Sequence, residues 1–196
     1  MNTNINAAFL VENGFCEREY IEMQEMFSKM GIPSRIISSN AKLLTSWNKL
    51  DLPKDSHWGM KYAADYHINN SPGYNFDILV IPGGRRSAEK LKLDPSVKSF
   101  VSGFLASVKP VIVYNLGHEV LFHLDLLVEH HISRYSPDID YDLDVMTAGT
   151  HDSDIVCSRN LISLSGFNHD RPLLRTYIEA ILSGNLTETP SNHKAA

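Results

Sequence analysis

Three short segments of the chain are almost entirely apolar, and they constrain the fold more than any other feature. Residues 7–11 read AAFLV, residues 76–81 read FDILVI and residues 110–114 read PVIVY. Strands that are apolar on both faces are typical of a parallel sheet that helices cover on each side, whereas a half-solvated antiparallel sheet gives an alternating pattern. These segments are therefore predicted to be buried strands of an α/β protein.

Helical patterns alternate with these strands. Residues 17–30 carry apolar side chains at helical spacing and end before Gly31, and residues 94–108 begin with Asp94 and Pro95 as N-cap and first helical residue. The remaining predicted elements are helices over residues 120–127 and 171–182 and strands over residues 34–38, 154–157 and 160–164. Alternating strands and helices predict a flavodoxin-like three-layer αβα sandwich with a mostly parallel sheet.

The length fits one domain. The chain has 196 residues, and we predict a single domain over residues 1–184 followed by a polar tail, residues 185–196, that frays. Residues 40–75 have mixed composition, and only a small hairpin around residues 62–68 is predicted there.

Charge and composition exclude several partners. The net charge is -5, and the longest basic cluster is Arg85-Arg86, so no nucleic acid is expected as a partner. No apolar run, residues 78–81 included, approaches the roughly 20 residues of a membrane span, so no membrane is expected either. Two cysteines, Cys16 and Cys157, and the lack of a signal-like N-terminus predict a cytoplasmic protein.

The chemistry is expected in the loops that follow the strands, because open α/β sheets bind ligands at the carboxyl ends of their strands. After residues 110–114 the chain turns at Asn115-Leu116-Gly117 and enters a helix. In α/β enzymes such a strand-to-helix turn presents a nucleophile, but a carboxamide is a poor nucleophile. Asn tolerates positive φ well, so Asn115 can keep the turn without the reactive group; a turn with no role is the alternative.

Residues 76–84 and 109–117, together with the segment GFCERE at residues 14–19, resemble the ThiJ/PfpI superfamily, a class I glutamine amidotransferase-like group that includes intracellular proteases and a deglycase. The likeness runs from Ala7 to about Leu182. It implies the αβα fold, a hydrolase-type activity where the family's cysteine is present, and a homodimer.

The resemblance also assigns site residues. Glu19 falls on the glutamate that contacts the family's reactive cysteine, and that cysteine is replaced by Asn115. The histidine that follows it in the protease branch is replaced by Leu116. The resemblance further implies a backbone N–H nest at Gly83, Gly84 and Gly117 and a pocket tyrosine at Tyr135, for which packing in the core is the alternative. Because the nucleophile pair is missing, we predict that the Asn115 amide hydrogen-bonds Glu19.

Other side chains could replace the missing pair. Cys16 lies three residues before Glu19, and a thiol at a helix N-terminus has a lowered pKa, so a displaced nucleophile is one alternative and a packed thiol the other. His118 or Glu19 could act as general acid or base. Arg85 and Arg86 could hold an anionic group, or they could pair with Glu89.

No metal or cofactor is predicted. The histidines His118 and His123 are five residues apart, whereas the zinc-helix signature needs four, and residues 138–144 mimic a calcium loop without its Gly and Glu positions. Three functions remain open: an altered or inactive family member that binds a small polar metabolite, a hydrolase or lyase that uses Glu19, His118 or Cys16, and a homo-oligomeric interaction module.

Overall fold

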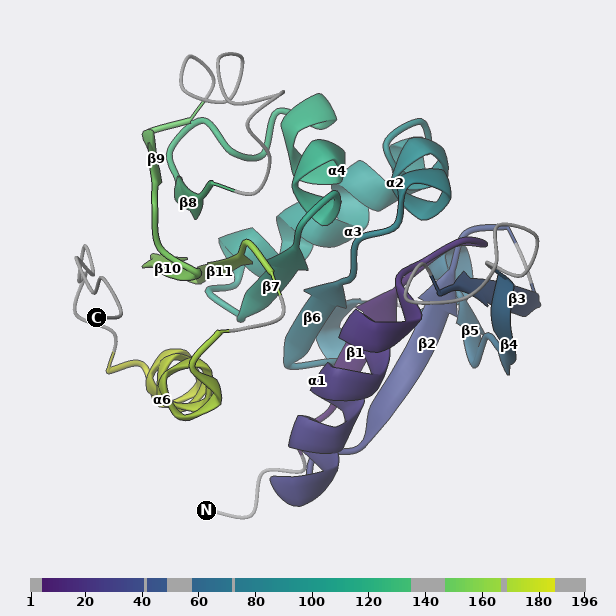
Figure 1. Ribbon diagram of the computed structural model, residues 1–196, viewed down its shortest axis with the longest axis horizontal. Helices are drawn as coiled ribbons and strands as arrows, with labels where there is room; N and C mark the ends of the chain where they lie inside the picture. Colours follow the sequence, from purple (N-terminus) through teal and green to yellow (C-terminus); the bar gives the residue numbers. More distant parts are fainter. Residues whose placement is uncertain are drawn as a thin grey trace.

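The structure, a computed structural model, describes residues 5–40, 42–48, 58–71, 73–134, 147–166 and 169–185. Its centre is a seven-stranded sheet in the order β10, β11, β7, β6, β1, β2, β5 (Figure 1). All neighbouring strands are parallel except β10, which is antiparallel to β11. The bounds are β1 (Ala7–Leu10), β2 (Ser34–Ser38), β5 (Tyr66–His67), β6 (Ile78–Ile81), β7 (Val111–Tyr114), β10 (Ile155–Ser158) and β11 (Leu161–Leu164). The prediction of a mostly parallel sheet is confirmed.

Helices cover both faces of this sheet. In β1, Ala7 and Phe9 point into one apolar core, while Ala8 and Leu10 point into the other, as the alternation of a strand requires. Two helices, α1 and α6, complete the first core, and three others, α2, α3 and α4, complete the second (Figure 1). The bounds are α1 (Glu17–Lys29), α2 (Arg85–Leu91), α3 (Pro95–Ala106), α4 (Gly117–His123) and α6 (Arg171–Leu182). The three-layer αβα sandwich is thereby confirmed.

Helices α3 and α6 begin with a capping aspartate and a proline, whereas α4 and α2 differ from the prediction. Asp94 Oδ1 accepts a hydrogen bond from Ser96 N at 2.9 Å, and Pro95 is the first helical residue of α3, as predicted. The helix predicted over residues 120–127 instead begins at Gly117, because the positive φ of 39° at Asn115 turns the chain directly into α4. The short helix α2, which follows the Gly83-Gly84 turn, is missing from the prediction altogether.

The hairpin predicted around residues 62–68 is wrong in position. Residues 40–75 instead contain an antiparallel pair, β3 (Leu43–Trp47) and β4 (Trp58–Ala63), and β5 joins the main sheet beside β2. The Asp65 carboxylate accepts a hydrogen bond from Ile36 N at 2.7 Å, and this contact fixes the approach to β5. A long-range side-chain contact therefore decides the pairing, and local propensity does not report it.

The β3–β4 pair docks on the loop that follows β1. Gly14 N donates to Thr45 O at 2.8 Å, and Trp47 N donates to Phe15 O at 2.7 Å. The buried carboxylate of Glu17 adds three hydrogen bonds to the pair, from Ser46 Oγ, Met60 N and Tyr62 Oη at 2.9 to 3.0 Å. The docking places Trp47 beside the carboxyl edge of the sheet.

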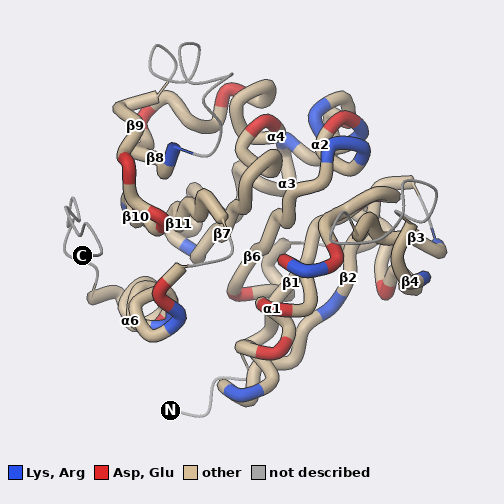
Figure 2. Tube along the Cα trace, viewed as in Figure 1, with Lys and Arg blue, Asp and Glu red and all other residues tan. Residues whose placement is uncertain are grey.

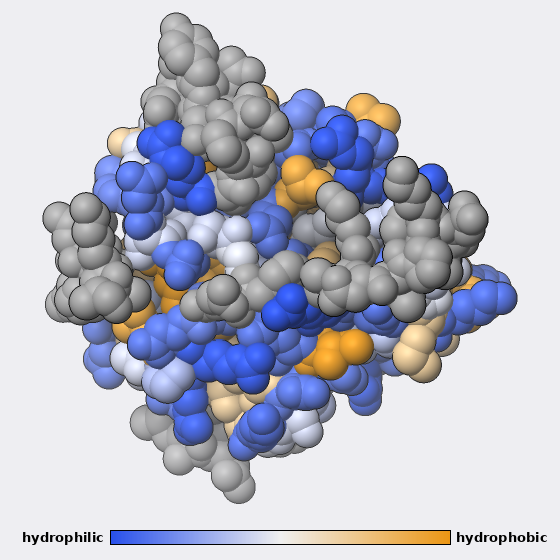
Figure 3. Space-filling view, viewed as in Figure 1, coloured by the Kyte–Doolittle hydropathy of each residue, from blue (hydrophilic) through white to orange (hydrophobic). Residues whose placement is uncertain are grey.

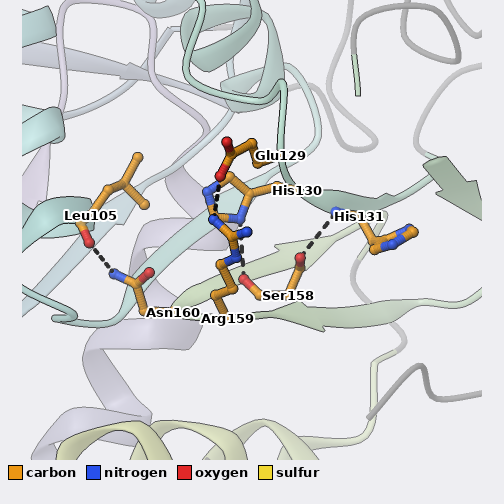
Figure 4. Close-up of polar contacts among 7 residues, drawn as sticks. All are labelled: Leu105, Glu129, His130, His131, Ser158, Arg159 and Asn160. Carbon is orange, nitrogen blue, oxygen red and sulfur yellow. Dashed lines mark hydrogen bonds and ion pairs between the residues drawn. The ribbon is translucent and has the colours of Figure 1, made fainter. Parts of the chain in front are cut away.

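A second small pair lies near the far edge of the sheet. It consists of β8 (His131–Ser133) and β9 (Gly149–His151), which run parallel to each other and which the sequence pattern does not predict. Side chains of the nearby β10–β11 turn hold neighbouring segments (Figure 4): Asn160 donates to Leu105 O at 3.3 Å and Ser158 Oγ accepts from His131 N at 3.0 Å. These contacts are non-local, so they have no signature in the local sequence.

The face of the molecule in Figure 3 is largely hydrophilic, with small separate apolar patches. The large exposed apolar side chains are scattered, and Leu93 and Tyr74 are among them. Scattered exposed apolar residues are normal for a folded surface. In the part of the chain that the structure describes, no helix has the length and apolar character that a membrane crossing requires.

Candidate site at the carboxyl edge of the sheet

The candidate site lies where β7, β6 and β1 end side by side. The loops that follow these strands pack closely: Cys16 N donates to Gly83 O at 2.9 Å, and a Cβ at Gly84 would lie 2.3 Å from Gly14 O. Gly84 has a φ of 107°, which side chains rarely adopt, so glycine is required there on two grounds. This packing brings the residues around Cys16, Gly83 and Asn115 together.

Asn115 occupies the strained turn that the sequence predicts. Its φ is 39°, in the left-handed region, and its backbone N donates to Leu164 O at 3.0 Å. Its side-chain Nδ2 donates to Glu19 Oε1 at 2.5 Å, which is the predicted hydrogen bond. The carboxamide therefore points toward the first turn of α1, where Glu19 lies.

Glu19 is a buried carboxyl group with only 2 % of its surface exposed. Burial raises its pKa from 4.5 to about 7, and hydrogen bonds from Asn115, Gly83 and the Cys16 thiol act in the opposite direction. The second oxygen, Oε2, accepts from Gly83 N at 2.5 Å. Glu19 therefore exchanges a proton near neutral pH while its two oxygens stay in fixed positions.

The Gly83 amide is not available for the predicted N–H nest. Its hydrogen bond to Glu19 uses the only proton on that nitrogen, so Gly83 cannot also polarise a substrate carbonyl. A Cβ at Gly83 would lie 3.1 Å from Glu19 Oε2, so glycine here lets the carboxyl group approach. Gly117 has a packing role, because a Cβ there would lie 2.6 Å from Ile81 O.

The Cys16 thiol does not have the lowered pKa that its helix N-terminal position suggests. Burial raises its pKa from 9.0 to about 12, and the negative charge of Glu19 acts in the same direction. Of the two alternatives for Cys16, the raised pKa supports the packed thiol over the displaced nucleophile, because desolvation outweighs the backbone hydrogen bonds that favour the thiolate. Burial has the same effect on Cys157, whose pKa is also raised to about 12.

His118 lies behind the turn and not in the cavity. It is completely buried, and its Nδ1 lies 2.6 Å from Asn115 O. A carbonyl oxygen can only accept, so Nδ1 carries the proton and Nε2 accepts from Ser163 Oγ, which lies 2.6 Å away. Burial lowers the pKa of His118 to about 4, so the ring is neutral at pH 7. These contacts make His118 a positioning residue for the Asn115 turn.

A hydroxyl near this site has no protein partner among the described residues. Tyr114 is fully buried, and its Oη makes no hydrogen bond to them. We expect the Tyr114→Phe protein to be as stable as the wild type or more stable by about 1 to 2 kcal/mol, because the substitution removes a buried unpaired hydroxyl. Urea unfolding measures this difference, and a destabilisation above about 1 kcal/mol would contradict it.

The site residues surround a cavity of about 640 Å³. Five of the predicted ligand-binding or catalytic residues line it: Cys16, Glu19, Gly84, Asn115 and Leu116. The other lining residues that the structure describes are Gly14, Arg18, Trp47, Asn48, Arg85 and Arg86. Gly83, Gly117 and His118 are not lining residues, and Tyr135 and residues 138–144 lie outside the described residues.

No local sequence signal marks Arg18, Trp47 or Asn48 as site residues. Trp47 reaches the cavity only because the β3–β4 pair docks on the loop after β1, and nothing local to residues 40–48 indicates that contact. In the described segments, no group of three or more His, Cys, Asp or Glu side chains is arranged to hold a metal ion.

Residues 5–180 match the DJ-1/PfpI family. The Bacillus subtilis protein named "Putative cysteine protease YraA" is 32% identical over 118 residues, which cover 57% of this chain and 69% of that protein. This chain therefore belongs to the DJ-1/PfpI family, as the resemblance in its sequence suggests.

Solved structures agree on the fold. A ThiJ/PfpI domain protein from Brachyspira murdochii superposes with a TM-score of 0.71 at 19% identity, covering 95% of this chain and 100% of that one. A two-domain protein from Anabaena variabilis with DJ-1/ThiJ/PfpI-like and ferritin-like domains gives 0.68 at 24% identity; the match covers 91% of this chain and about half, 49%, of that protein. At these identities the likeness establishes the architecture, whereas activity depends on the site.

Proposed function

We propose that this protein is a DJ-1/PfpI-family member without the family's thiol chemistry, and that it binds a small polar metabolite in the cavity at the carboxyl edge of the sheet. The observation that carries the proposal is the Asn115 carboxamide, which points at Glu19 in the floor of that cavity. A carboxamide cannot replace a thiolate as a nucleophile. The nearby thiol of Cys16 is no substitute, since its pKa is about 12.

The cavity has the size and polar groups that a small ligand needs. Its volume of about 640 Å³ falls within the range typical of small-molecule sites. Glu19 and Asn115 supply hydrogen-bonding groups at the floor, and Leu116 supplies apolar contact. A ligand with a hydroxyl, amide or carbonyl group suits this combination.

Catalysis by Glu19 is a second candidate function. Its pKa of about 7 suits a general acid or base at neutral pH, and the group lines the cavity. His118 lacks this access because it is completely buried behind the turn. A proton-transfer reaction such as hydrolysis or elimination fits this candidate.

Turnover assays separate the two candidates. We expect the full chain to show no peptidase or amidase turnover on chromogenic peptide and anilide substrates that depends on Asn115. Turnover that disappears in the Asn115→Ala protein would overturn the binding proposal. Turnover that survives in Asn115→Ala but disappears in Glu19→Gln would instead establish the acid–base candidate.

A variant that fills the cavity tests binding directly. Leu116 is half-buried in the cavity lining, so Leu116→Trp should occupy the space for a ligand. We expect small polar compounds that raise the Tm of the wild type to have no effect on Leu116→Trp, because a ligand at about 100 times its Kd adds roughly 2.7 kcal/mol only where it binds. Equal shifts in the Tm of both proteins would mean that the compounds bind outside this cavity.

The cytoplasmic location and the homodimer stay predictions.

A further inference from the structure

Several arginines of the described chain are paired with acids. Four of them form ion pairs with a carboxylate at 2.5 to 3.0 Å: Arg134 with Asp152, Arg159 with Glu129, Arg171 with Glu22 and Arg175 with Glu179. Arg85 and Arg86 differ, since neither forms an ion pair with any described acid. The expected partner Glu89 is exposed and makes no such contact with either. No described carboxylate therefore neutralises these two charges through a direct contact.

Arg86 is held in place by aromatic rings. Its guanidinium lies over the ring of Trp47 at 5.2 Å and over the ring of Trp58 at 4.7 Å. The two indole rings are inclined at 85° to each other, so the planar guanidinium lies flat on at most one of them, and the N–H donors that do not face the other ring are left for a partner. The stem of Arg86 packs against Gly14, where a Cβ would lie 2.7 Å from Arg86 Cβ. Arg86 is therefore an oriented donor at the cavity mouth.

Among the described residues, positive charge outweighs negative charge around the cavity. Arg18, Arg85 and Arg86 line it, and Glu19 is the only acidic side chain of the described lining. Figure 2 shows basic residues in α2, which carries Arg85 and Arg86, although the whole chain has a net charge of -5. Glu19 lies at the floor, where each of its oxygens accepts one hydrogen bond, from Asn115 or from Gly83. The excess charge therefore faces the mouth.

We propose that the ligand of this cavity is an anionic small molecule whose carboxylate or phosphate is bound by Arg86 and Arg85, while its other end reaches Asn115 and Glu19. Guanidinium groups bind both oxyanions through paired N–H···O hydrogen bonds. This inference rests on the proposed function, because it specifies the ligand of the same cavity.

The two tryptophans give a direct test. Trp47 and Trp58 are the only tryptophans of the chain, and both contact Arg86. Three probes are titrated into the full chain at low ionic strength: inorganic phosphate, succinate and the neutral analogue succinamide. Trp fluorescence and titration calorimetry are followed. We expect at least one of the two anions to bind at least tenfold more tightly than succinamide, and the tighter anion identifies the oxyanion.

Substitutions locate the binding. We expect Arg86→Gln to weaken anion binding at least tenfold, and Arg86→Lys to weaken it less, because lysine keeps the charge but loses the planar donors. Arg175→Gln is the matched control, since Arg175 is paired with Glu179 on α6. Anion binding that is unchanged in Arg86→Gln would overturn the inference.

The results distinguish a failure of the anion assignment from a failure of the small-molecule site. If succinamide binds as tightly as the anions, and Leu116→Trp blocks it, the charge assignment is wrong while the small-molecule site stands. If none of the three probes binds the wild type, the anion assignment is wrong, and the Leu116→Trp comparison with other small polar compounds decides separately whether the small-molecule site stands. Calorimetry measures binding without relying on fluorescence, so it decides the result where a substitution by itself changes the Trp fluorescence.

Discussion

The Asn115→Cys protein is expected to react with a thiol reagent such as DTNB at neutral pH, in one equivalent, whereas the wild-type protein reacts very slowly. The native thiols, Cys16 and Cys157, have pKa values raised to about 12 by burial. A new thiol at position 115 lies in a cavity lined by three arginines, whose positive charges favour a thiolate and outnumber the opposing charge of the adjacent Glu19. Its pKa should not exceed the usual value of about 8.5, so we expect a rate about 10³-fold higher at pH 7.

Two control proteins make this result specific. Asn115→Ser keeps a small polar side chain at the turn without sulfur and should react like the wild type. Ser183→Cys places an ordinary thiol at an exposed position after α6 and gives the reference rate. A rate for Asn115→Cys that equals the wild-type rate would mean that position 115 is closed to small molecules. We also expect Asn115→Cys to lose about 1 kcal/mol of stability, because cysteine tolerates positive φ less well than asparagine.

The second large effect concerns the pH dependence of stability. Glu19 has a folded-state pKa of about 7, above its usual 4.5, so the folded protein retains a proton that the unfolded chain has released between these values. Stability from this group therefore falls as the pH rises through this window, by about 3 kcal/mol. His118 acts in the opposite direction. Its folded-state pKa of about 4 lies below its usual 6.5, so stability is lost as the pH falls from 6.5 to 4, again by about 3 kcal/mol.

The two contributions nearly cancel in the wild type, and single substitutions separate them. We expect Glu19→Gln to lose stability relative to the wild type as the pH falls from 7 to 4.5, because the His118 effect is then unopposed. The amide that this substitution introduces can be accommodated, because the Asn115 carboxamide can turn its oxygen toward it. His118→Asn should show the reverse slope. Urea unfolding at a series of pH values measures these differences.

Glu25→Gln is the matched control for this experiment, since Glu25 is an exposed glutamate of the same helix α1. Its stability should follow the wild type at every pH. If Glu19→Gln also follows the wild type, the Glu19 carboxyl does not retain a proton near neutral pH in the folded protein, and the acid–base candidate loses its basis.

Part of the candidate site can be predicted from the sequence. The resemblance to known family members leads to the pairing of Asn115 with Glu19, and the structure contains that hydrogen bond at 2.5 Å. The arginine pair after the Gly-Gly turn is visible in the sequence, but its relation to Glu89 stays open at that level. The choice between a reactive and a packed thiol at Cys16 stays open in the sequence, because a sequence shows that a thiol precedes a helix but not how deeply it is buried.

Local patterning is sufficient for the layers of the fold. Short apolar runs become central strands wherever helices cover them, and an Asp-Pro pair starts a helix through contacts within a few residues. These interactions join residues that are neighbours along the chain, so the sequence alone is enough to predict them. The tertiary structure alone places Trp47 and Trp58 against Arg86, buries His118 behind the turn and raises the pKa of Glu19. Each of these depends on desolvation or contact between segments far apart in the chain, and such quantities exist only once the chain has packed.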